Sequence, residues 1–473
     1  MKAVEQIYTG CLAQGAYFIE SEGEAAVIDP LRETLPYLRR AEERGVKIKY
    51  IFETHFHADF VSGHVDLAKK TGATIIYGPT AETDFESHIA TDGEEFKIGN
   101  LTIRVLHTPG HTPESTTYLL INDQGKEEAI FTGDTLFIGD VGRPDLAQKG
   151  ENLTQEDLAG WLYESLRTKI FPLPDDIIIY PAHGAGSACG KNMSTETWDT
   201  LGNQKKLNYA LRDDMSRAEF IREVTDGLTP PPQYFAKNAL MNKQGYESID
   251  SVMEHGSRAL SVEEFELLGE EDDVVLLDVR NQRDFVKGFI PGSVFIGLDG
   301  SFAPWVGALI PDIKQKIILI APEGREEETV MRLARVGYDH ALGYLKGGFS
   351  AWKAAGKTVH EIQSIDVPTF KQHLTEHPEI NILDVRKPNE YEKSHLTSAH
   401  HFPLDFINAH MAEINPSSTY YLQCRSGYRS TITASILKAR GYHHLIDVIG
   451  AFDDMQAEDM PMVGTCESVN VRS

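Results

Sequence analysis

The sequence is poor in cysteine, in positive charge and in long apolar runs, and each shortage excludes a class of protein. Only four cysteines occur among 473 residues. Because no two of them form a CxxC pair, neither a disulfide framework nor a cysteine-rich zinc site is available. No segment approaches the roughly 18 apolar residues that a membrane helix needs. We therefore expect a cytoplasmic protein with no membrane partner.

Positive charge is equally scarce. Lysine and arginine contribute 45 residues against 71 aspartates and glutamates, which gives a formal charge of −26. Such a surface repels phosphate backbones, so nucleic acid is excluded as a partner. The apolar fraction of 41% and the charged fraction of 25% are those of an ordinary folded protein. At roughly 150 residues per domain, the length predicts about three domains.

An internal repeat divides the second half of the chain. Residues 276–285 (LLDVRNQRDF) recur as residues 382–391 (ILDVRKPNEY), so that Asp384 stands 106 positions after Asp278. An apolar strand, a turn with glycine and arginine, and a helix follow each copy. Such a period indicates a duplicated domain, because each copy is long enough to bury its own core. The alternation of short β-rich and helical runs predicts small α/β domains with parallel sheets.

The first half is predicted to be a separate α/β domain with two sheets and helices outside them. Runs rich in β-branched and aromatic residues predict its strands at 16–19, 25–28, 49–52, 74–77, 101–106, 117–121, 129–132 and 177–180. The proline run at 229–232 cannot lie inside a helix or a central strand and is the best linker candidate. The predicted domains span residues 1–245, 246–358 and 359–473, with a frayed polar tail from Gly464.

Histidine and aspartate side chains follow four of the predicted strands. In each case an apolar strand delivers them into a loop rich in Gly, Pro or Thr, which is how a rigid scaffold presents ligands at one sheet edge. A single histidine is more often structural, but four such turns in one domain favour a site for a divalent transition metal. His64, which opens a predicted helix, is expected to be structural. The candidate residues are His55, His57, Asp59, His111, Asp134 and His183.

The first of these turns resembles the metallo-β-lactamase superfamily. Its HxHxDH motif appears here as His55, His57 and Asp59, followed by Phe60 in place of the last histidine. The resemblance implies an αββα fold. In the two-metal hydrolases of this superfamily the residue at Phe60 binds the second metal, together with those matching Asp59 and His183. A phenyl ring cannot bind a metal ion, so we expect one metal per domain.

The segment at 142–145 (GRPD), just after the Asp134 turn, is most similar to the persulfide dioxygenase branch of that superfamily. This resemblance implies one Fe(II), held by His55, His111 and Asp134, whereas His57 is not a direct ligand. Two imidazoles and one carboxylate leave three positions open on an octahedral iron, which suits a persulfide and O2 together. The residues that could orient ligands, water or substrate around it are His57, Asp59, His183 and Arg143.

Several alternatives stay open. Histidine and aspartate bind both iron and zinc, so the ligands alone do not identify the metal. A zinc-dependent thioester hydrolase of the glyoxalase II type is therefore the first alternative. A non-catalytic sulfur sensor or scaffold is the second. Arg143 is as consistent with a structural ion pair to Asp145 as with substrate binding. Cys189 follows the fourth turn closely enough to reach substrate, and its role is left open, whereas Cys11 and Cys466 are expected to be structural.

A single thiol lies in a loop suited to anions near the C-terminus. Cys424 directly follows the strand predicted at 420–423 and precedes a helix predicted at 430–440, which Gly441 ends. Backbone N–H groups, the positive end of that helix and two guanidinium groups favour the thiolate and an attacking anion. The loop consists of Arg425, Ser426, Gly427, Tyr428, Arg429 and Ser430.

This segment resembles the rhodaneses, in which the cysteine of CRSGxRS carries a transferable sulfur as a persulfide. The segments at 384–386 and 449–451 also resemble that family. A cysteine phosphatase is the competing use of such a loop, but its cysteine and arginine are usually one residue further apart than Cys424 and Arg429. In the first repeat the matching residue is Ala321, and four glutamates follow it in the predicted loop. We expect that copy to keep the fold, lose catalysis and serve as a spacer or an interaction surface.

The order of a dioxygenase-like metal domain, a degenerate rhodanese and an active rhodanese resembles the bacterial persulfide dioxygenase–sulfurtransferases. The resemblance implies sulfide detoxification, in which a low-molecular-weight thiol persulfide reacts with O2 at iron to give sulfite and the thiol. Cys424, loaded as a persulfide, then passes sulfur to sulfite and forms thiosulfate. Joining the two sites raises the effective concentration of the intermediate. We expect a homo-oligomer, and the sequence does not identify the carrier thiol.

Overall fold

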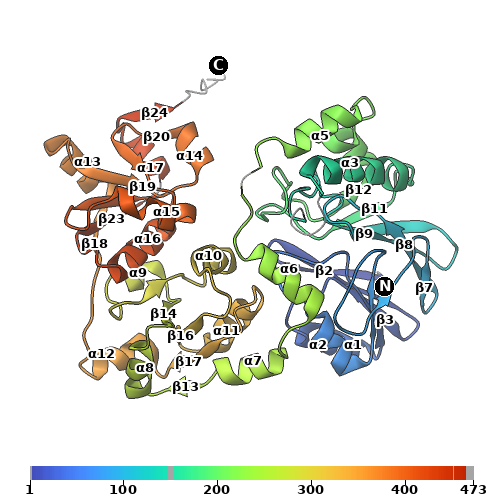
Figure 1. Ribbon diagram of the computed structural model, residues 1–473, viewed down its shortest axis with the longest axis horizontal. Coiled ribbons are helices and arrows are strands. Elements are labelled where there is room, and N and C mark those ends of the chain that lie inside the picture. Colours follow the sequence, from blue (N-terminus) through green and yellow to red (C-terminus); the bar gives the residue numbers. More distant parts are fainter. Residues whose placement is uncertain (1–2, 148–152, 229, 451, 465–473) are drawn as a thin grey trace. The chain divides into compact units, whose positions relative to one another are not determined.

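A computed structural model describes residues 3–147, 153–228, 230–450 and 452–464 (Figure 1). Its chain divides into two compact units. The first comprises residues 1–252, 311–313 and 331–339, and the second comprises residues 253–310, 314–330 and 340–473. Within the described ranges, no helix is long and apolar enough to cross a bilayer.

The first unit contains two six-stranded sheets. One has the order β1 (Val4–Thr9), β2 (Gln14–Ser21), β3 (Glu24–Ile28), β4 (Lys47–Phe52), β5 (Thr74–Tyr77), β6 (His88–Ile89). The other has the order β12 (Asp199–Thr200), β11 (Ile178–Pro181), β10 (Glu127–Gly133), β9 (Thr116–Ile121), β8 (Leu101–His107), β7 (Glu95–Ile98). Side chains alternate between the faces of each strand, so Ile28 and Phe52 of one sheet meet Tyr118 and Phe131 of the other in a shared core. Each predicted strand overlaps one of these.

Helices cover the outer faces of both sheets. Tyr37 of α1 (Leu35–Arg44) and Leu67 of α2 (His64–Thr71) pack in the core outside the first sheet. Leu162 of α3 (Gln155–Ser165) and Phe220 of α5 (Arg217–Thr225) pack outside the second. The layers are therefore helix, sheet, sheet and helix, which confirms the predicted αββα fold. Helix α2 begins at His64, as predicted.

The carboxyl ends of the parallel strands place several loops at one edge of this unit. Strands β3 and β4 are parallel neighbours in one sheet, and β10 and β11 are parallel neighbours in the other. Because parallel neighbours end at the same edge, the loops that follow all four strands begin there. These loops carry Asp29, His55, Asp134 and His183.

The predicted linker is wrong as a domain boundary. The first unit continues past Pro230–Pro232 into α6 (Phe235–Gln244) and the start of α7 (Ile249–Gly256). The Asn242 side chain of α6 donates to the carbonyls of His57 and Phe60 and accepts from the Ser62 N–H, all at 2.7–2.9 Å. This segment therefore caps the loop after β4 instead of leaving the domain. Thr229 lies outside the described residues.

The second unit contains two parallel five-stranded sheets of matching topology, as the repeat predicts. The first has the order β13 (Ala259–Leu260), β17 (Ala341–Leu345), β16 (Lys316–Ile320), β14 (Val274–Asp278), β15 (Val294–Phe295). The second has the order β18 (Gln363–Asp366), β23 (Leu445–Ile449), β22 (Tyr420–Gln423), β19 (Asn381–Asp384), β21 (Ala399–His401). Parallel sheets are buried on both faces, which explains why strands such as β16 are continuous apolar runs.

The recurring Asp-Val-Arg segments have one structural role in both copies. Asp278 and Asp384 end β14 and β19, and each accepts a 2.6 Å contact from the arginine two residues later. Arg280 then lies 4.1 Å over the Phe349 ring, and Arg386 lies 3.5 Å over Phe452. These ion pairs tie the end of a central strand to a helix later in the same repeat, α12 (Gly348–Ala354) in the first copy and α17 (Phe452–Ala457) in the second.

The remaining long helices surround these sheets (Figure 1). They are α8 (Val262–Gly269), α10 (Phe302–Leu309), α11 (Glu326–Ala334), α12 (Gly348–Ala354), α13 (Val367–Glu376), α14 (Pro388–Lys393), α16 (Tyr428–Ala439) and α17 (Phe452–Ala457). Helix α16 begins two residues before the predicted start. Gly464 ends the short strand β24 (Met462–Gly464), which pairs with β20 (Ser394–Leu396), so the prediction of a frayed tail is wrong at this residue. Residues 465–473, Cys466 included, lie outside the described residues.

Candidate functional site

The structure brings His55, His111 and Asp134 together from three different loops. Each offers one nitrogen or oxygen atom, and these atoms lie within 4.8 Å of one another. The Asp134 Oδ2 atom lies 3.4 Å from His111 Nε2 and 3.9 Å from His55 Nε2, separations too long for strong hydrogen bonds. All three side chains are at most 2% exposed.

The donor set fits a metal ion. Neither carboxylate oxygen of Asp134 has a hydrogen-bond partner among the described residues, although the group is fully buried. A buried carboxylate without a partner is costly, and a cation between Asp134 and the two imidazoles removes that cost. The site therefore supports a metal cofactor.

Two hydrogen bonds orient the imidazoles. The Thr54 hydroxyl lies 3.0 Å from His55 Nδ1, and the Arg143 carbonyl lies 2.8 Å from His111 Nδ1. Both contacts leave Nε2 directed at Asp134, the arrangement by which outer partners fix metal-binding histidines. Burial lowers the pKa of His55 well below its usual value, and the nearby His57, His111 and His183 lower it further. His55 is therefore a neutral imidazole, the form that binds metals.

His57 is held from behind by two buried carboxylates. Its Nε2 lies 3.0 Å from Asp29 Oδ1 and 3.6 Å from Glu53 Oε2. Burial disfavours the charged ring, but Asp29 and then Glu53 outweigh it and raise the pKa of His57 to about 9. The Phe60 ring stacks on the imidazole with centroids 4.3 Å apart. Asp29 and Glu53 were not among the predicted site residues, although Asp29 directly follows a predicted strand.

The other residues predicted to surround the metal lie beside it. His183 Nε2 is 3.4 Å from Asp59 Oδ2 and 3.5 Å from Asp134 Oδ1. His57, Asp59 and His183 form a second buried group whose ligand atoms lie within 4.8 Å of one another. Phe60 stands next to this group at the position of the missing histidine.

Arg143 and Cys189 are buried next to the candidate metal ligands. The Arg143 guanidinium makes two contacts of 2.6 and 2.7 Å with Asp145, which is the structural alternative considered for this residue. Cys189 is buried, and its sulfur belongs to a group with Asp134 and His183 whose atoms lie within 4.8 Å. The thiol therefore lies at the metal centre itself. Cys11 is half-buried, with its sulfur 3.5 Å from an Arg335 nitrogen.

His64 is buried behind the centre, as its structural interpretation predicts. Its Nδ1 lies 3.5 Å from Glu53 Oε1, and its ring packs between Phe85 and Tyr246. It does not belong to the groups of potential metal ligands among the described residues.

A cavity of about 1080 Å³ opens beside His111. Phe56, Glu114 and Asp145 line it, and the segment that was predicted to be a linker, Pro230–Pro232 with α6, forms another wall. A pocket of this size accepts a small-molecule thiol carrier.

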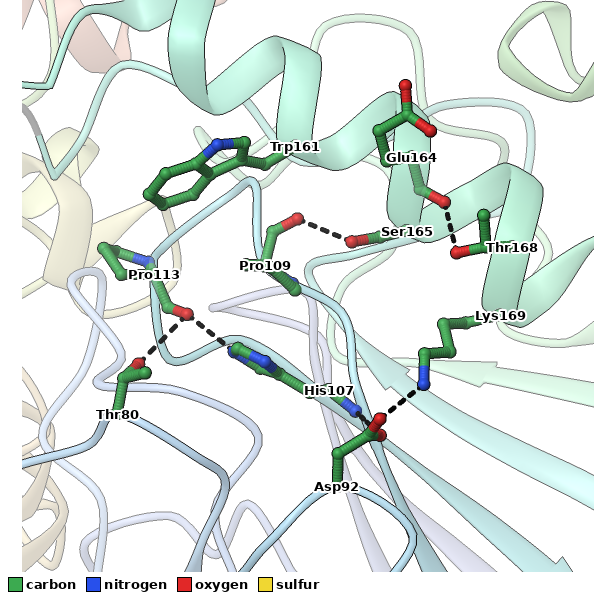
Figure 2. Close-up of a pocket in the computed structure, with 10 residues that line it drawn as sticks. All are labelled: Thr80, Asp92, His107, Pro109, Pro113, Trp161, Glu164, Ser165, Thr168 and Lys169. Atoms are coloured by element: carbon green, nitrogen blue, oxygen red, sulfur yellow. Dashed lines mark hydrogen bonds and ion pairs between the residues drawn. The ribbon is translucent and has the colours of Figure 1, made fainter.

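A smaller pocket of about 510 Å³ is lined by residues on both sides of His111 in sequence, His107 and Pro109 before it and Pro113 after it (Figure 2). His107 and Thr80 both contact the Pro113 carbonyl, at 2.9 and 3.2 Å, and Ser165 donates to the Pro109 carbonyl at 2.8 Å (Figure 2). These contacts brace both ends of the loop and so help to fix the position of His111.

The second candidate site is the thiol loop after β22. Cys424 is buried, and the Gly427 N–H donates to its sulfur at 3.1 Å. Gly427 has a φ of +85° at the N-cap of α16, a backbone conformation that favours glycine. The Cys424 thiol also lies 3.6 Å from the Ser430 hydroxyl. The sulfur therefore faces the N-terminus of a helix, as predicted.

The two arginines of this loop differ from the expectation that both would serve an anion. Glu390 of α14 binds the Arg429 guanidinium with contacts of 2.5 and 2.8 Å. A largely buried guanidinium needs such a partner, and the pair cancels most of the charge that Arg429 offers to an anion. Arg425 and Ser426 are exposed.

The matching loop of the first repeat has lost the thiol, and its one arginine is paired with carboxylates. Ala321 is buried at the position of Cys424, and Arg325 pairs with Asp299 and Glu328 at 2.7 Å. The predicted loop of four glutamates is wrong in part, because Glu326 and its two neighbours form the first turn of α11. Carboxylates are stabilised there by the helix dipole.

A buried carboxyl, Asp447, lies on β23 beside the strand that ends before Cys424. The Thr431 hydroxyl of α16 lies 3.4 Å from its Oδ2. Burial raises the pKa of Asp447 to about 6, and hydrogen bonds from Ser430 and Thr431 oppose the shift. The folded chain therefore keeps this proton at a pH where the unfolded chain has released it.

The raised pKa of Asp447 predicts a pH-dependent stability. Its contribution is fully present below the unfolded pKa and is lost as pH rises through the folded pKa, that is from about pH 4 to 6. Asp447→Asn cannot ionise, so above about pH 7 it is expected to raise the free energy of unfolding by about 1–3 kcal/mol. Calorimetric melting from about pH 4.5 to 8 measures the gain, which should shrink toward the acid end. A gain that is equal at all pH values, or shared by the exposed control Asp272→Asn, contradicts the assignment.

The comparisons with known proteins match both parts of the chain. The sequence profile described as the Metallo-beta-lactamase superfamily matches residues 9–183, and that of the Rhodanese-like domain matches residues 261–355 and 366–458. Human persulfide dioxygenase ETHE1, mitochondrial, is 32% identical over 212 residues, covering 44% of this chain and 74% of that protein. Hydroxyacylglutathione hydrolase GloC of Haemophilus influenzae is 30% identical over 211 residues, covering 40% of this chain and 88% of GloC.

A solved structure extends the match beyond the first domain. A metallo-beta-lactamase from Staphylococcus aureus subsp. aureus COL is 31% identical with a TM-score of 0.63, and the match covers 72% of this chain and 98% of that one. Together with the two rhodanese-like matches, this agrees with the domain order predicted from the motifs. The chain belongs to the metallo-beta-lactamase superfamily, as a fusion of a domain homologous to the ETHE1 persulfide dioxygenases with two rhodanese-like domains.

Proposed function

We propose that the N-terminal domain is a non-haem iron persulfide dioxygenase. The observation that carries the proposal is the buried group of His55, His111 and Asp134, in which neither Asp134 oxygen has a hydrogen-bond partner among the described residues. Two histidines and one carboxylate are the donor set of non-haem Fe(II) oxygenases. Homology to ETHE1 supports the same assignment. The proposed site holds one Fe(II) per chain.

The proposed reaction is RSSH + O2 + H2O → RSH + HSO3⁻ + H⁺. Fe(II), when bound, supplies redox chemistry toward O2 that zinc cannot supply. Thr54 and the Arg143 carbonyl hold the two imidazoles in the orientation that leaves Nε2 free. Asp59 Oδ1 and His183 Nε2 have no hydrogen-bond partner among the described residues. His183 Nε2 lies 3.4 Å from Asp59 Oδ2 and 3.5 Å from Asp134 Oδ1, so these two side chains can hold or pass a proton beside Asp134. The cavity beside His111 receives the thiol carrier.

The C-terminal rhodanese-like domain is proposed to transfer sulfur through Cys424. A Cys424 persulfide passes its outer sulfur to sulfite, so that a Cys-S–S bond breaks, a bond in thiosulfate forms and the Cys424 thiolate is released. The Gly427 N–H, 3.1 Å from the sulfur, stabilises that thiolate. Persulfide, O2, sulfite and thiosulfate are thus the proposed small-molecule reactants. A cytoplasmic location and a homo-oligomeric state remain predictions.

A zinc-dependent thioester hydrolase is the second candidate. It is supported by homology to hydroxyacylglutathione hydrolases such as GloC. Phe60 argues against it, because a two-metal hydrolytic site needs a ligand at that position.

Metal analysis separates the two candidates. Protein prepared anaerobically without added metal is expected to contain about one iron per chain and to consume about one O2 for each persulfide oxidised, as the reaction requires. The carrier is unidentified, so oxygen uptake is measured with glutathione persulfide, cysteine persulfide and coenzyme A persulfide in turn. Zinc in place of iron, with hydrolysis of S-lactoylglutathione and no oxygen uptake on the persulfides tested, would overturn the dioxygenase assignment.

A further inference from the structure

The middle rhodanese-like domain, residues 261–355, keeps its fold without a thiol, and its edge strand touches the sulfur-transfer domain. Strand β15 is the last strand of the middle sheet, so its outer N–H and C=O groups need partners from outside that sheet. The Phe295 N–H donates at 2.9 Å to the hydroxyl of Ser435, which lies on α16, the helix that follows Cys424. The edge of the middle sheet is therefore covered by the helix of the thiol loop.

The turn after β15 contacts the thiol loop directly. The Tyr428 hydroxyl donates to the Gly297 carbonyl at 2.7 Å. The Tyr428 ring packs edge-to-face on Phe295, with centroids 5.9 Å apart. A Cβ atom placed on Gly300 would stand 2.3 Å from that ring, so the ring lies flat against the glycine backbone. Residues 297–300 thus form a surface shaped to hold one tyrosine.

Tyr428 is the first residue of α16, and the residue before it donates to the reactive sulfur. Holding Tyr428 fixes the start of the helix and with it the Gly427 N–H, 3.1 Å from Cys424 Sγ. Within its own domain the loop is tied by the Phe452 N–H, which donates to the Arg425 carbonyl at 3.0 Å. The loop is therefore anchored to its own domain by Phe452 and by the Arg429–Glu390 pair, and to the middle domain by Tyr428.

The loop of the middle domain that matches the thiol loop contacts the 297–300 turn. Arg325 occupies the position that matches Tyr428, one residue after the shared glycine. Its guanidinium contacts Asp299 at 2.7 Å and Glu328 at 2.7 Å. Arg325 thus ties the 297–300 turn to the start of α11.

We propose that the middle domain is a positioning domain for sulfur transfer, in which the 297–300 turn holds Tyr428 and so keeps the Gly427 N–H on the Cys424 sulfur. The inference rests on the proposed sulfur transfer through Cys424. Tyr428 is a positioning residue here, because it acts on the sulfur through Gly427. The expected consequence is that a change in the middle domain, far from Cys424 in sequence, alters the reactivity of that thiol.

Gly300→Ala in the full chain tests the proposal, because its methyl group displaces the Tyr428 ring. Sulfur transfer from thiosulfate to cyanide is expected to fall about tenfold, the effect of losing one hydrogen bond to a charged sulfur. The pH midpoint for alkylation of Cys424 by iodoacetamide, followed by mass spectrometry of its peptide, is expected to rise. Persulfide-dependent oxygen uptake should stay unchanged.

Gly269→Ala is the matched control in the same domain, since its added Cβ meets only the Leu276 side chain, at 3.3 Å. Tyr428→Phe, which removes only the hydroxyl, should reproduce the direction of both effects if Gly300→Ala does not fold. Unchanged transfer and an unchanged alkylation profile in Tyr428→Phe and in any folded Gly300→Ala would overturn the positioning role. Alkylation of Cys424 is measurable even if sulfur transfer does not use this thiol. Failure of the positioning role can therefore be distinguished from failure of the proposed sulfur transfer.

Discussion

Replacing Cys424 with serine is expected to lower thiosulfate formation by at least about a thousandfold while persulfide-dependent oxygen uptake stays within about twofold. A serine hydroxyl accepts the Gly427 N–H at nearly the same place, so the loop keeps its shape. It cannot carry a sulfane sulfur, however, and the transfer step loses its only covalent carrier. Because the proposed oxidation takes place at His55, His111 and Asp134, that half of the reaction is unaffected.

The products identify which half has failed. Wild-type protein given a persulfide and O2 is expected to release thiosulfate, whereas Cys424→Ser releases sulfite in an amount equal to the oxygen consumed. Ion chromatography of both anions, with an oxygen electrode, makes the measurement. Cys11→Ser is the matched control, since Cys11 is a half-buried cysteine outside both candidate sites. If oxygen uptake and thiosulfate formation fell together in Cys424→Ser, the separation into two sites would be wrong.

The parts of both sites that are local in sequence could be predicted. His55, Asp134 and Cys424 each follow an apolar strand within a few residues, and a strand end followed by a loop fixes roughly where such a side chain lies. The strands of the first domain also follow from local patterns, because strand alternation is a property of short windows. Their αββα layering was implied by the resemblance of the histidine motif to the metallo-β-lactamase superfamily, not by periodicity. The two rhodanese-like domains could also be predicted, because residues 276–285 recur as residues 382–391.

The contacts that modify those residues could not be predicted, because they join distant segments. Glu390 reaches Arg429 across 39 residues, and Asn242 reaches the His57 carbonyl across 185. Consecutive prolines cannot form a helix interior or a central strand, so residues 230–232 were predicted to be a linker. Helix α6, which follows them, nevertheless packs on the loop after β4 that carries His57. Glu53 adjoins the histidine motif, but only the fold shows that its carboxylate points at His57 and not at solvent.

Exchanging His111 for alanine is expected to reduce bound iron at least about tenfold and to lower persulfide-dependent oxygen uptake by about a thousandfold. His111 supplies one of three proposed ligands, and its loss leaves His55 and Asp134, too few donors to retain the ion against dilution. Metal content by mass spectrometry of anaerobically prepared protein gives a readout that does not depend on turnover.

His88→Ala is the matched control, because His88 lies in the same domain on β6 and pairs with Glu94 at the surface. It should keep both iron and oxygen uptake. Transfer of sulfur from thiosulfate to cyanide through Cys424 should survive in both variants, which checks that the second unit is folded. Full oxygen uptake by a metal-free His111→Ala protein would refute the iron site. Wild-type protein that binds no metal and consumes no O2 would instead favour the sensor or scaffold alternative, in which the buried histidines and Asp134 serve only the fold.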